Sequence, residues 1–412
     1  MDIFSLLLPK YTIDNNKKIR LISLFSGYDS QKLAFNYIGV DVEHYRTIEF
    51  DKYAMQSLNE IHNTNFETKD ITKVSADELG IVDTKDYTYI LTYSFPCTDL
   101  SLAGKRAGMD RDSGTRSGLL WEVERLLKET KEKPQILIME NVPQVLSAKG
   151  WREWNLFLES LGYSNYAQVL NAKDYGIPQN RERCFMVSIL GEYSYEFPKP
   201  FKLKDRLKDF LEENVDEKYY LSEKTLQRIS KWKAQQDPLK DIDKEKVVSP
   251  TLTARGAGEE HSGMILINEN LYNKQYLGTY QFAKSEAFMN GKDRFEPNKE
   301  IIDCILTSQK VGVVVKDSEN VDMCNCKNIP SGSYNYQLSD LRIRKLTPCE
   351  CFKLMGVKPS DYNKITCSNA QKYKQAGNSI VTTVLMAIYN QLFENCDYKY
   401  YIEELLKELR TN

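Results

Sequence analysis

A single cysteine stands where a thiol could act as a nucleophile. Cys97 follows Phe95-Pro96 at the end of an apolar segment, and the loop after it is rich in glycine and in cationic side chains. A thiol attacks only as the thiolate, and nearby cations or a helix N-terminus lower its pKa. Most cysteines, however, are unreactive buried side chains. Cys97 therefore indicates nucleophilic catalysis only if other reactive side chains lie beside it.

A carboxylate and two guanidinium groups could share a crevice with this thiol. Glu140 ends another apolar segment, and a carboxyl group in a dry pocket can hold its proton near neutral pH. Arg181 and Arg183 stand on alternate residues, so both side chains would lie on one side of an extended segment. Alone, each of these charges is more simply explained as a solvated or structural group. Beside Cys97, they could bind a carbonyl oxygen and a phosphate.

The segments around these residues predict a Rossmann-like, doubly wound α/β sheet. A strand pattern breaks at Gly27, a helical pattern follows, and Glu49 comes about 20 residues beyond the glycine turn, as in nucleotide-binding units. The predicted strands are 19–25, 45–50, 87–92 and 135–139, with a helix over 119–132. Ligands of such sheets bind at the carboxyl ends of the strands, where Cys97 and Glu140 occur.

The composition and the hydrophobic periodicity of the sequence change along the chain, and these changes predict three parts. Residues 1–192 form the predicted catalytic and cofactor-binding domain. Residues 193–345 are charged, aromatic-rich and weakly periodic, and we expect them to form a second, smaller domain with strands at 264–267 and 311–315. Residues 346–412 regain a helical pattern and end in an apolar helix, so we expect this segment to return to the first domain.

The bulk composition limits the class of protein. The 412 residues exceed the size at which one hydrophobic core stops growing, so two domains are expected. No apolar run approaches the roughly 20 residues needed to span a bilayer, and the nine cysteines form no regular framework. We therefore expect a cytoplasmic protein with reduced thiols. Cys324 and Cys326 lack further ligands at zinc spacing, so we expect no metal, and a net charge of −2 means that any nucleic-acid surface must be local.

Taken together and in order, these segments resemble the cytosine-5 DNA methyltransferase family. The corresponding motifs are Phe25-Ser-Gly27, Glu49, Asp70-Ile71, Phe95-Pro-Cys97, Glu140-Asn-Val142, Gln179-Asn-Arg-Glu-Arg183, Arg344-Lys-Leu-Thr-Pro348 with Gly356, and Gln375-Ala-Gly-Asn-Ser379. A Pro-Cys pair alone carries little information, but the ordered set is specific. The resemblance covers most of the chain outside residues 192–340.

The resemblance implies covalent chemistry on cytosine. Cys97 would add to carbon 6 of the ring, which makes carbon 5 nucleophilic toward the methyl group of S-adenosylmethionine. Glu140 would hydrogen-bond the ring nitrogen N3 and the exocyclic amine as charge develops. Arg183 would hold the base oxygen O2, and Arg181 would support the site electrostatically. The group that removes the carbon 5 proton is left open.

The resemblance also implies a binding site for S-adenosylmethionine. Phe25 would lie against the adenine, Glu49 would bind the ribose hydroxyls, and Asp70 would accept a hydrogen bond from the adenine amine. The implied cofactor residues are Phe25, Ser26, Gly27, Asp29, Ser30, Glu49, Phe50, Asp70, Ile71, Pro96, Asn378 and Ser379.

The cofactor turn departs from the family pattern at two positions. Asp29 and Ser30 stand where the family usually has glycines. Aspartate tolerates a positive φ better than most residues, so the turn could survive at a cost of about 1 kcal/mol. The added carboxylate could then face the cationic end of the donor, and weakened cofactor binding is the alternative. Ser94, where glycine is common before Phe-Pro-Cys, is a milder departure.

The resemblance makes double-stranded DNA the partner, bound by a monomer. The target cytosine would be flipped out of the duplex, and the glycine-rich loop 101–118 would close over it. Residues 193–345 would form the target-recognition domain and read the major groove. The candidate DNA contacts are Ser101, Lys105, Arg106, Thr251, Leu252 and Arg255. For each of them, an ordinary solvated loop residue is the alternative.

Other functions compete with methylation of duplex DNA. An enzyme of the same chemistry could act on RNA, although the long second domain favours reading of a duplex. A DNA-binding protein could keep the fold and have lost the cofactor through Asp29 and Ser30. A dehydrogenase would leave Cys97, Glu140 and Arg183 unexplained. The sequence therefore favours a DNA methyltransferase from a restriction-modification system, a phage or a mobile element.

Overall fold

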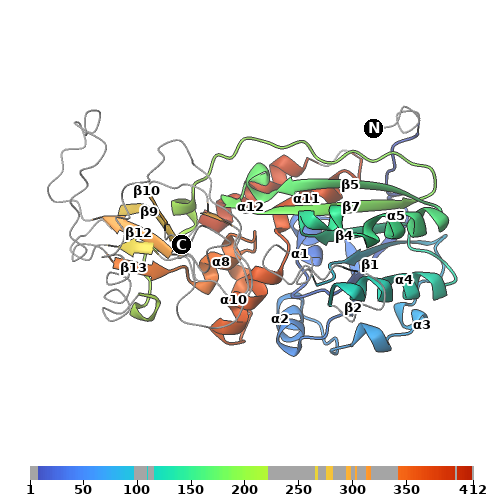
Figure 1. The fold of residues 1–412 in the computed structure, drawn as a ribbon, viewed down its shortest axis with the longest axis horizontal. Helices are drawn as coiled ribbons and strands as arrows, with labels where there is room; N and C mark the ends of the chain where they lie inside the picture. The colour runs from blue at the N-terminus through green and yellow to red at the C-terminus, as the bar shows by residue number, and fades with distance from the viewer. Residues whose placement is uncertain are drawn as a thin grey trace.

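The computed structural model describes residues 8–96, 109, 116–220, 342–394 and 397–410, together with five strands between residues 265 and 316. In Figure 1, the larger of two main sheets lies on the right and the smaller on the left. None of the helices in the described part of the chain is long and apolar enough to cross a membrane.

The larger sheet has six strands in the order β2-β1-β3-β4-β7-β5. They are β1 (Lys18–Leu24), β2 (Val42–Ile48), β3 (Tyr87–Tyr93), β4 (Ile136–Asn141), β5 (Tyr163–Asn171) and β7 (Glu182–Leu190). β2, β1, β3 and β4 run parallel, and β7 pairs antiparallel with β4 and β5. The predicted doubly wound α/β class is confirmed. β2 begins and ends earlier than the predicted 45–50, and Glu49 follows it directly.

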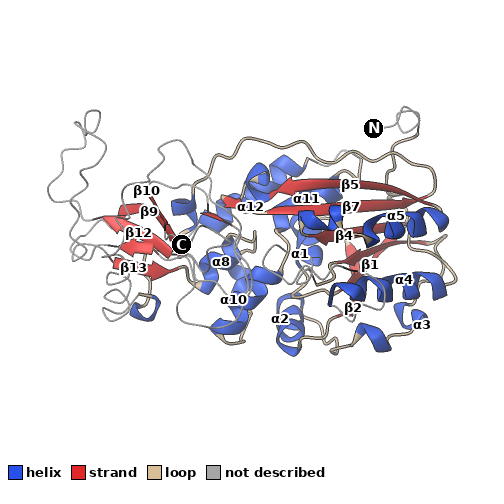
Figure 2. Cartoon of the chain, in the orientation of Figure 1, coloured by secondary structure: helices blue, strands red, loops and turns tan. Residues whose placement is uncertain are grey.

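Alternate residues of the strands build two cores, one on each face of this sheet. Leu21 and Ile90 belong to one cluster, whereas their neighbours Ile22 and Leu91 belong to the other, because successive side chains of a strand point to opposite faces. Helices cover both faces (Figure 2). The first face carries α1 (Ser30–Tyr37), α11 (Thr382–Asn390) and α12 (Tyr398–Arg410), and the second carries α3 (Ala76–Leu79), α4 (Leu120–Glu129) and α5 (Gly150–Ser160).

Short helices fill the connections between these elements. The α-helices among them are α2 (Lys52–His62), α8 (Pro348–Lys353), α9 (Pro359–Tyr362) and α10 (Asn369–Asn378). The 3-10 helices are η2 (Ile71–Lys73), η3 (Arg116–Leu119), η4 (Pro143–Ser147), η5 (Ala172–Tyr175), η6 (Leu207–Phe210) and η7 (Glu217–Tyr219). Side chains set where several begin: Asp51 accepts from two backbone amides of α2, and Thr347 forms a capping box with Glu350 in α8.

The C-terminal helices pack against the first elements of the chain. Phe35 of α1 and Tyr389 of α11 stack with their ring centroids 4.0 Å apart. The Ile13 amide donates to the Leu392 carbonyl at 2.8 Å. The segment after β7 lies on the same body, where the Ser194 amide donates to the Pro9 carbonyl at 2.9 Å. Residues far apart in the sequence therefore share one core.

The smaller sheet is antiparallel and has five strands in the order β10-β9-β12-β13-β8. They are β8 (Ile265–Ile267), β9 (Gln275–Gln281), β10 (Arg294–Pro297), β12 (Gly312–Lys316) and β13 (Arg342–Lys345). β8 and β12 match the strands predicted at 264–267 and 311–315. A parallel pair, β6 (Gln179–Asn180) with β11 (Ile302–Asp303), links the two parts of the chain, and α8 and α10 lie between the main sheets (Figure 1).

Candidate active site

Four parallel strands end at one edge of the larger sheet. Leu24 of β1 is in register with Ile48 of β2 and Tyr93 of β3, and Tyr93 is in register with Met139 of β4. The chain leaves β1 toward β2 on one side and continues with β3 on the other, which makes this edge the switch point where ligands of such sheets bind. The predicted site segments end or follow these strands: 25–30, 49–50, 94–96 and 140–142.

The turn after β1 contains three residues in the left-handed region. Phe25, Gly27 and Asp29 have φ values of 55°, 59° and 59°. The Gly27 amide donates to Glu49 Oε2 at 2.8 Å, and a Cβ added to Gly27 would meet no atom of the described residues within 4 Å. Left-handed backbone at a phenylalanine is strained, and such strain is typical of functional sites. The turn therefore presents an open face, backed by a carboxylate, to a ligand.

Glu49 and Phe50 are adjacent but differ in exposure. Glu49 Oε1 accepts from the Asp51 amide at 2.7 Å, and burial raises the pKa of Glu49 against the opposing effect of its amide hydrogen bonds. The Phe50 side chain is 77% exposed. A carboxylate beside an exposed aromatic ring can bind a ligand that has hydroxyl groups and a flat heterocycle.

Asp70 and Ile71 lie beside Glu49 because the Lys69 amide donates to the Glu49 carbonyl at 2.8 Å. Asp70 Oδ1 accepts from the hydroxyl and the amide of Thr72 at 2.8 and 3.1 Å, and these hydrogen bonds lower the pKa of Asp70. Ile71 is buried in the core on the second face of the sheet. Asp70 thus places a charged carboxylate at this edge of the sheet, whereas the Ile71 side chain packs in the adjacent core.

The turn between α10 and α11 lies against the turn after β1. The Tyr28 hydroxyl donates to Ser379 Oγ at 2.8 Å. Arg181 Nη2 donates to the carbonyls of Gly377 and Ser379 at 3.0 and 2.7 Å. Asn378 is exposed. Arg181 therefore holds the end of α10, where Asn378 is the last helical residue, and the turn that follows at Ser379.

Glu140 and Arg183 form a buried ion pair at the end of β4. Arg183 Nε lies 3.1 Å from Glu140 Oε1, and each residue is 8% exposed. β7 runs antiparallel to β4 and sets Glu140 opposite Phe185. Arg183 is two residues from Phe185 on the same strand, so its side chain lies on the same face and reaches Glu140. Burial raises the pKa of Glu140, and the charge of Arg183 opposes the rise. The carboxyl group is therefore held nearer to its protonated form than a solvated glutamate.

Two side chains fix the backbone just before Cys97. Asn141 Nδ2 donates to the Phe95 carbonyl at 3.0 Å, and Ser117 Oγ donates to the Pro96 carbonyl at 2.8 Å. The end of β3 is thereby tied to the end of β4 and to η3. Cys97 itself lies outside the described residues.

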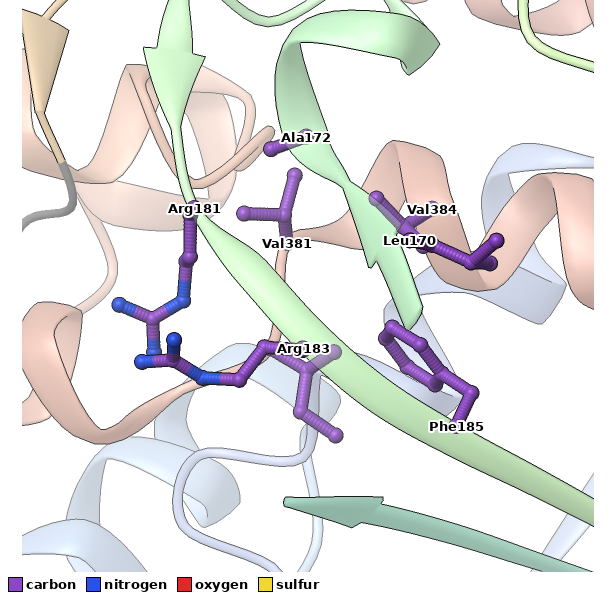
Figure 3. Close-up of a pocket in the computed structure, with 8 residues that line it drawn as sticks. Leu170, Ala172, Arg181, Arg183, Phe185, Val381 and Val384 are labelled. Carbon is purple, nitrogen blue, oxygen red and sulfur yellow. The ribbon is translucent and has the colours of Figure 1, made fainter. Parts of the chain in front are cut away.

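A pocket lies beside the two arginines. Figure 3 shows the guanidinium groups of Arg181 and Arg183 next to each other. The other lining residues are mostly apolar: Leu170, Ala172, Phe185, Ile380, Val381 and Val384. Paired guanidinium groups in apolar surroundings bind an oxygen acceptor more strongly than they do in water. In this structure Arg181 donates to the carbonyls of Gly377 and Ser379, and Arg183 is paired with Glu140.

Comparisons with known proteins assign the family. The profile described as C-5 cytosine-specific DNA methylase matches residues 19–394. The chain belongs to this family. It is therefore a DNA cytosine-5 methyltransferase. Over 393 residues, the methylase is 31% identical to the type II methyltransferase M2.ScrFI of Lactococcus lactis subsp. cremoris, covering 93% of this chain and 86% of the relative. Over 464 residues, it is 28% identical to the orphan methyltransferase M.SPBetaI of Bacillus phage SPbeta, covering 91% and 97%.

Solved structures share the Rossmann-like methyltransferase fold of this methylase. The S. pombe Dnmt2 methyltransferase superposes with a TM-score of 0.59 at 18% identity, covering 91% of this chain and 98% of that chain. A putative DNA modification methyltransferase encoded within an E. coli prophage superposes with a TM-score of 0.53 at 17% identity, covering 91% and 99%.

The two residues that replace the family's glycines point inward in this methylase. Asp29 is fully buried and caps α1 in the left-handed conformation. Its Oδ1 accepts from Ser23 Oγ and the Lys32 amide at 3.1 Å each, and its Oδ2 lies 2.8 Å from His44 Nε2. Ser30 is 2% exposed. The carboxylate lies beneath the turn, which corrects the expectation that it faces the donor.

Part of the predicted site falls outside the described residues. These positions are Cys97, Ser101, Lys105, Arg106, Thr251, Leu252 and Arg255, and their roles stay predictions. Within the part of the chain that the structure describes, no group of three or more His, Cys, Asp or Glu side chains is placed to hold a metal ion.

Three residues of this edge carry no strong signal in the sequence. Tyr28 lies inside the turn motif, but its contact with Ser379 joins residues 351 positions apart. Ser117 is one polar residue among many in a glycine-rich loop. His44 is one of only three histidines in the chain, and this rarity is the one signal that could have pointed to it.

Proposed function

We propose that this methylase transfers a methyl group from S-adenosylmethionine to carbon 5 of a cytosine flipped out of duplex DNA, with Cys97 as the nucleophile. The buried pair of Glu140 and Arg183 carries this proposal, because Glu140 also bonds Ser94, three residues before Cys97. It supplies a carboxyl group that can hold a proton and a cationic donor, at the point where the loop of Cys97 begins.

The edge at β1 and β2 fits S-adenosylmethionine. Gly27 lets the backbone approach the ligand, Glu49 offers a carboxylate to the ribose hydroxyls, and the exposed ring of Phe50 offers an apolar surface. Asp70 accepts from the adenine amine. When bound there, the cofactor supplies a methyl group on a cationic sulfur. The remaining proposed contacts are Phe25, Ser26, Ile71, Pro96, Asn378 and Ser379, with Asp29 and Ser30 contributing through the shape of the turn.

The residues at the end of β4 activate the cytosine. The Cys97 thiolate would add to carbon 6, and the electron pair of the carbon 5–carbon 6 double bond would form the new bond to the methyl carbon, while the electrons of the broken methyl–sulfur bond stay on the donor sulfur. Glu140 hydrogen-bonds N3 and the exocyclic amine, and Arg183 holds O2, so both stabilise the charge that develops on the ring. After transfer, a base removes the carbon 5 proton, the carbon–hydrogen electron pair restores the double bond, and the thiolate leaves carbon 6.

Duplex DNA is the proposed partner of the smaller sheet. A cytosine inside a duplex cannot reach the site unless it leaves the base stack. We assign residues 1–192 to catalysis, 193–345 to target recognition, and 346–412 to the segment that returns to the catalytic part. The proposed DNA contacts are Ser101, Lys105, Arg106, Thr251, Leu252 and Arg255. The type II and phage-encoded relatives support a restriction-modification or mobile-element setting. We also propose that the enzyme acts as a cytoplasmic monomer.

Trapping with 5-fluorocytosine tests the covalent step. Bisulfite sequencing of DNA exposed to the enzyme first locates the target word. A duplex with 5-fluorocytosine at that position should form an adduct that survives denaturing electrophoresis, because fluorine does not leave carbon 5 as the proton does. Cys97→Ser should form no adduct and transfer no methyl group, yet still bind the duplex. Absence of an adduct with the unaltered enzyme, or methylation by Cys97→Ser, overturns the covalent route.

The same assay separates the competing functions. Methyl incorporation into duplex DNA and not into transfer RNA supports the proposal, and the reverse result assigns the enzyme to RNA. Calorimetry with S-adenosylmethionine gives the second test. No binding at millimolar cofactor would support a DNA-binding protein that keeps the fold without the reaction.

A further inference from the structure

A chain of buried polar side chains crosses three strands beneath the cofactor turn. Thr92 Oγ1 of β3 donates to Ser23 Oγ of β1 at 3.4 Å, and Ser23 Oγ donates to Asp29 Oδ1 at 3.1 Å. From the other side, His44 Nε2 of β2 lies 2.8 Å from Asp29 Oδ2. Because a carboxylate can only accept, this His44 nitrogen carries the hydrogen. The turn is thereby bonded to the strands on both sides of β1.

Asp29 needs these donors for two reasons. It is a non-glycine residue at a φ of 59°, and its carboxylate is fully buried. A buried carboxylate without donors is strongly unfavourable. Burial alone would raise the pKa of Asp29, yet its hydrogen bonds, led by that of His44, lower it. The donors therefore make an aspartate tolerable at a position where glycine would need no support.

The same aspartate determines the shape of the turn. The Asp29 amide donates to the Ser26 carbonyl at 2.9 Å and closes the turn around Gly27. The Gly27 amide in turn points at Glu49. A shift of Asp29 would therefore move both the open face of Gly27 and its contact with Glu49.

We propose that His44 is a positioning residue for the cofactor: by donating to Asp29, it holds the turn 25–29 in the shape that presents Gly27 and Glu49 to S-adenosylmethionine. This inference rests on the proposed use of that cofactor.

The surroundings of the His44 ring leave the hydrogen bond to Asp29 as its main polar contact. The ring makes T-shaped contacts with His62 and Phe66, with ring centroids 5.1 and 5.0 Å away. Among the described residues, its second nitrogen, Nδ1, has no hydrogen-bond partner. The His62 Nε2 lies 3.1 Å from the Tyr28 carbonyl, and burial lowers the pKa of His62 to about 4, so this neighbour is neutral at physiological pH. The hydrogen bond to Asp29 can therefore be removed without breaking a second one.

A double-mutant cycle on the full chain tests the inference, with calorimetric binding of S-adenosylmethionine as the readout. His44→Leu should weaken binding about tenfold, because the buried carboxylate loses a donor and the turn relaxes. Asp29→Gly supplies the second corner of the cycle, because it removes the carboxylate to which His44 donates while glycine adopts the left-handed conformation freely. Adding His44→Leu to Asp29→Gly should then change the affinity by less than about twofold.

Matched variants separate positioning from general damage. His44→Gln retains an N–H near the place of Nε2 and should bind the cofactor almost as well as the unaltered enzyme, whereas His44→Asn should lose affinity as His44→Leu does. This pair gives the same test should His44→Leu not fold. Tyr389→Phe removes a buried hydroxyl that has no hydrogen-bond partner among the described residues, and it should leave cofactor binding unchanged.

Kinetics distinguish the outcomes further. For His44→Leu, the KM for the cofactor should rise while kcat at saturating cofactor and the KM for DNA stay within about twofold. If His44→Leu weakens cofactor binding equally in the unaltered enzyme and in the Asp29→Gly variant, His44 acts through packing and the inference is overturned. The inference is also overturned if His44→Leu causes no loss of affinity. If the unaltered enzyme does not bind S-adenosylmethionine, the proposed function itself fails.

Discussion

Asp29 and Glu140 are both buried carboxylates at the same edge of the larger sheet, and burial alone would raise the pKa of each. The oxygens of Asp29 accept hydrogen bonds from Ser23, His44 and a backbone amide, and its pKa is lowered. Burial raises the pKa of Glu140, and it stays raised although the charges of Arg183 and Arg181 and hydrogen bonds from Ser94 and Arg183 oppose the rise. The partners of Asp29 thus outweigh the effect of burial on its pKa, whereas those of Glu140 do not, which leaves Glu140 the better placed of the two for proton chemistry.

Glu350 extends the comparison of hydrogen-bond partners, because donors surround both of its oxygens, as they do in Asp29. It is fully buried, and both its oxygens accept from Arg344, at 2.7 and 2.8 Å. The amides of Thr347 and Glu212 donate to it as well, at 2.7 and 2.8 Å. These contacts tie the end of β13 to α8 and to the segment that follows β7. Because donors of the protein already occupy both oxygens, this carboxylate is expected to contribute to stability and not to catalysis.

Glu140→Gln should have the largest effect on turnover. The variant cannot hold a proton for N3, so kcat should fall about 100-fold or more, while the affinity for S-adenosylmethionine stays unchanged. Single-turnover methylation of a duplex and calorimetry measure the two quantities. Glu182→Gln, at an exposed neighbour of Arg183, is the control and should keep full activity. A kcat for Glu140→Gln that matches this control would remove Glu140 from the chemistry.

Glu350→Ala should have the largest effect on stability. It leaves the Arg344 guanidinium buried without its counter-charge, which should lower the free energy of unfolding by about 3–5 kcal/mol. Urea unfolding measures the loss, and methylation at a temperature where the variant is folded should change little. Glu404→Gln, on the exposed side of α12, should cost less than about 0.5 kcal/mol. If Glu350→Ala lowers the free energy of unfolding no more than Glu404→Gln does, the hydrogen bonds of Glu350 are not a major source of stability.

The two carboxylates of the comparison should give pH dependences of opposite sign. The folded-state pKa of Asp29 is lowered, so its charged form stabilises the fold above the unfolded-state pKa of about 3.9, and this contribution is lost as the pH falls below that value. Asp29→Asn should therefore cost about 1–3 kcal/mol at neutral pH and progressively less in acid.

The pKa of Glu140 is raised, so folding favours its protonated form, and the stability of the enzyme relative to Glu140→Gln should fall as the pH rises above about 4.3. Unfolding free energies of both variants, measured from about pH 2 to 8, test the difference in slope. Parallel curves would show that burial alone governs both carboxylates.

The sequence was sufficient to predict which residues end the strands. Apolar segments bounded by Gly27, Pro96 and Glu140 could be assigned to a parallel sheet, and such a sheet carries its ligands at the carboxyl ends of the strands. The start of β2 was harder to predict, because β2 is an edge strand whose first half carries Glu43 and His44 among apolar residues. A polar edge weakens the apolar pattern by which a strand is recognised.

The hydrogen-bond partners of the site could not be predicted from the sequence. The inward direction of Asp29 depends on donors from both β1 and β2, which only the register of the two strands brings together. Arg181 binds carbonyls 196 and 198 positions away, at Gly377 and Ser379. Such contacts depend on how α11 packs onto α1, and no local pattern encodes that packing.

Phe50→Ala should give the smallest effect on cofactor binding and stability among these predictions. It tests whether the cofactor is recognised by the exposed ring as well as by the turn that contains Asp29. Because the ring is 77% exposed, its loss should change the free energy of unfolding by less than about 0.5 kcal/mol. Stacking on an aromatic ring is worth about 0.5–1.5 kcal/mol, so binding of S-adenosylmethionine should weaken roughly 2- to 10-fold. Tyr400→Ala, at a ring of α12 that is 58% exposed, is the matched control and should leave binding unchanged. If both variants bind the cofactor equally well, the ring beside Glu49 is an ordinary exposed aromatic, and recognition on this side depends on the turn that Asp29 supports.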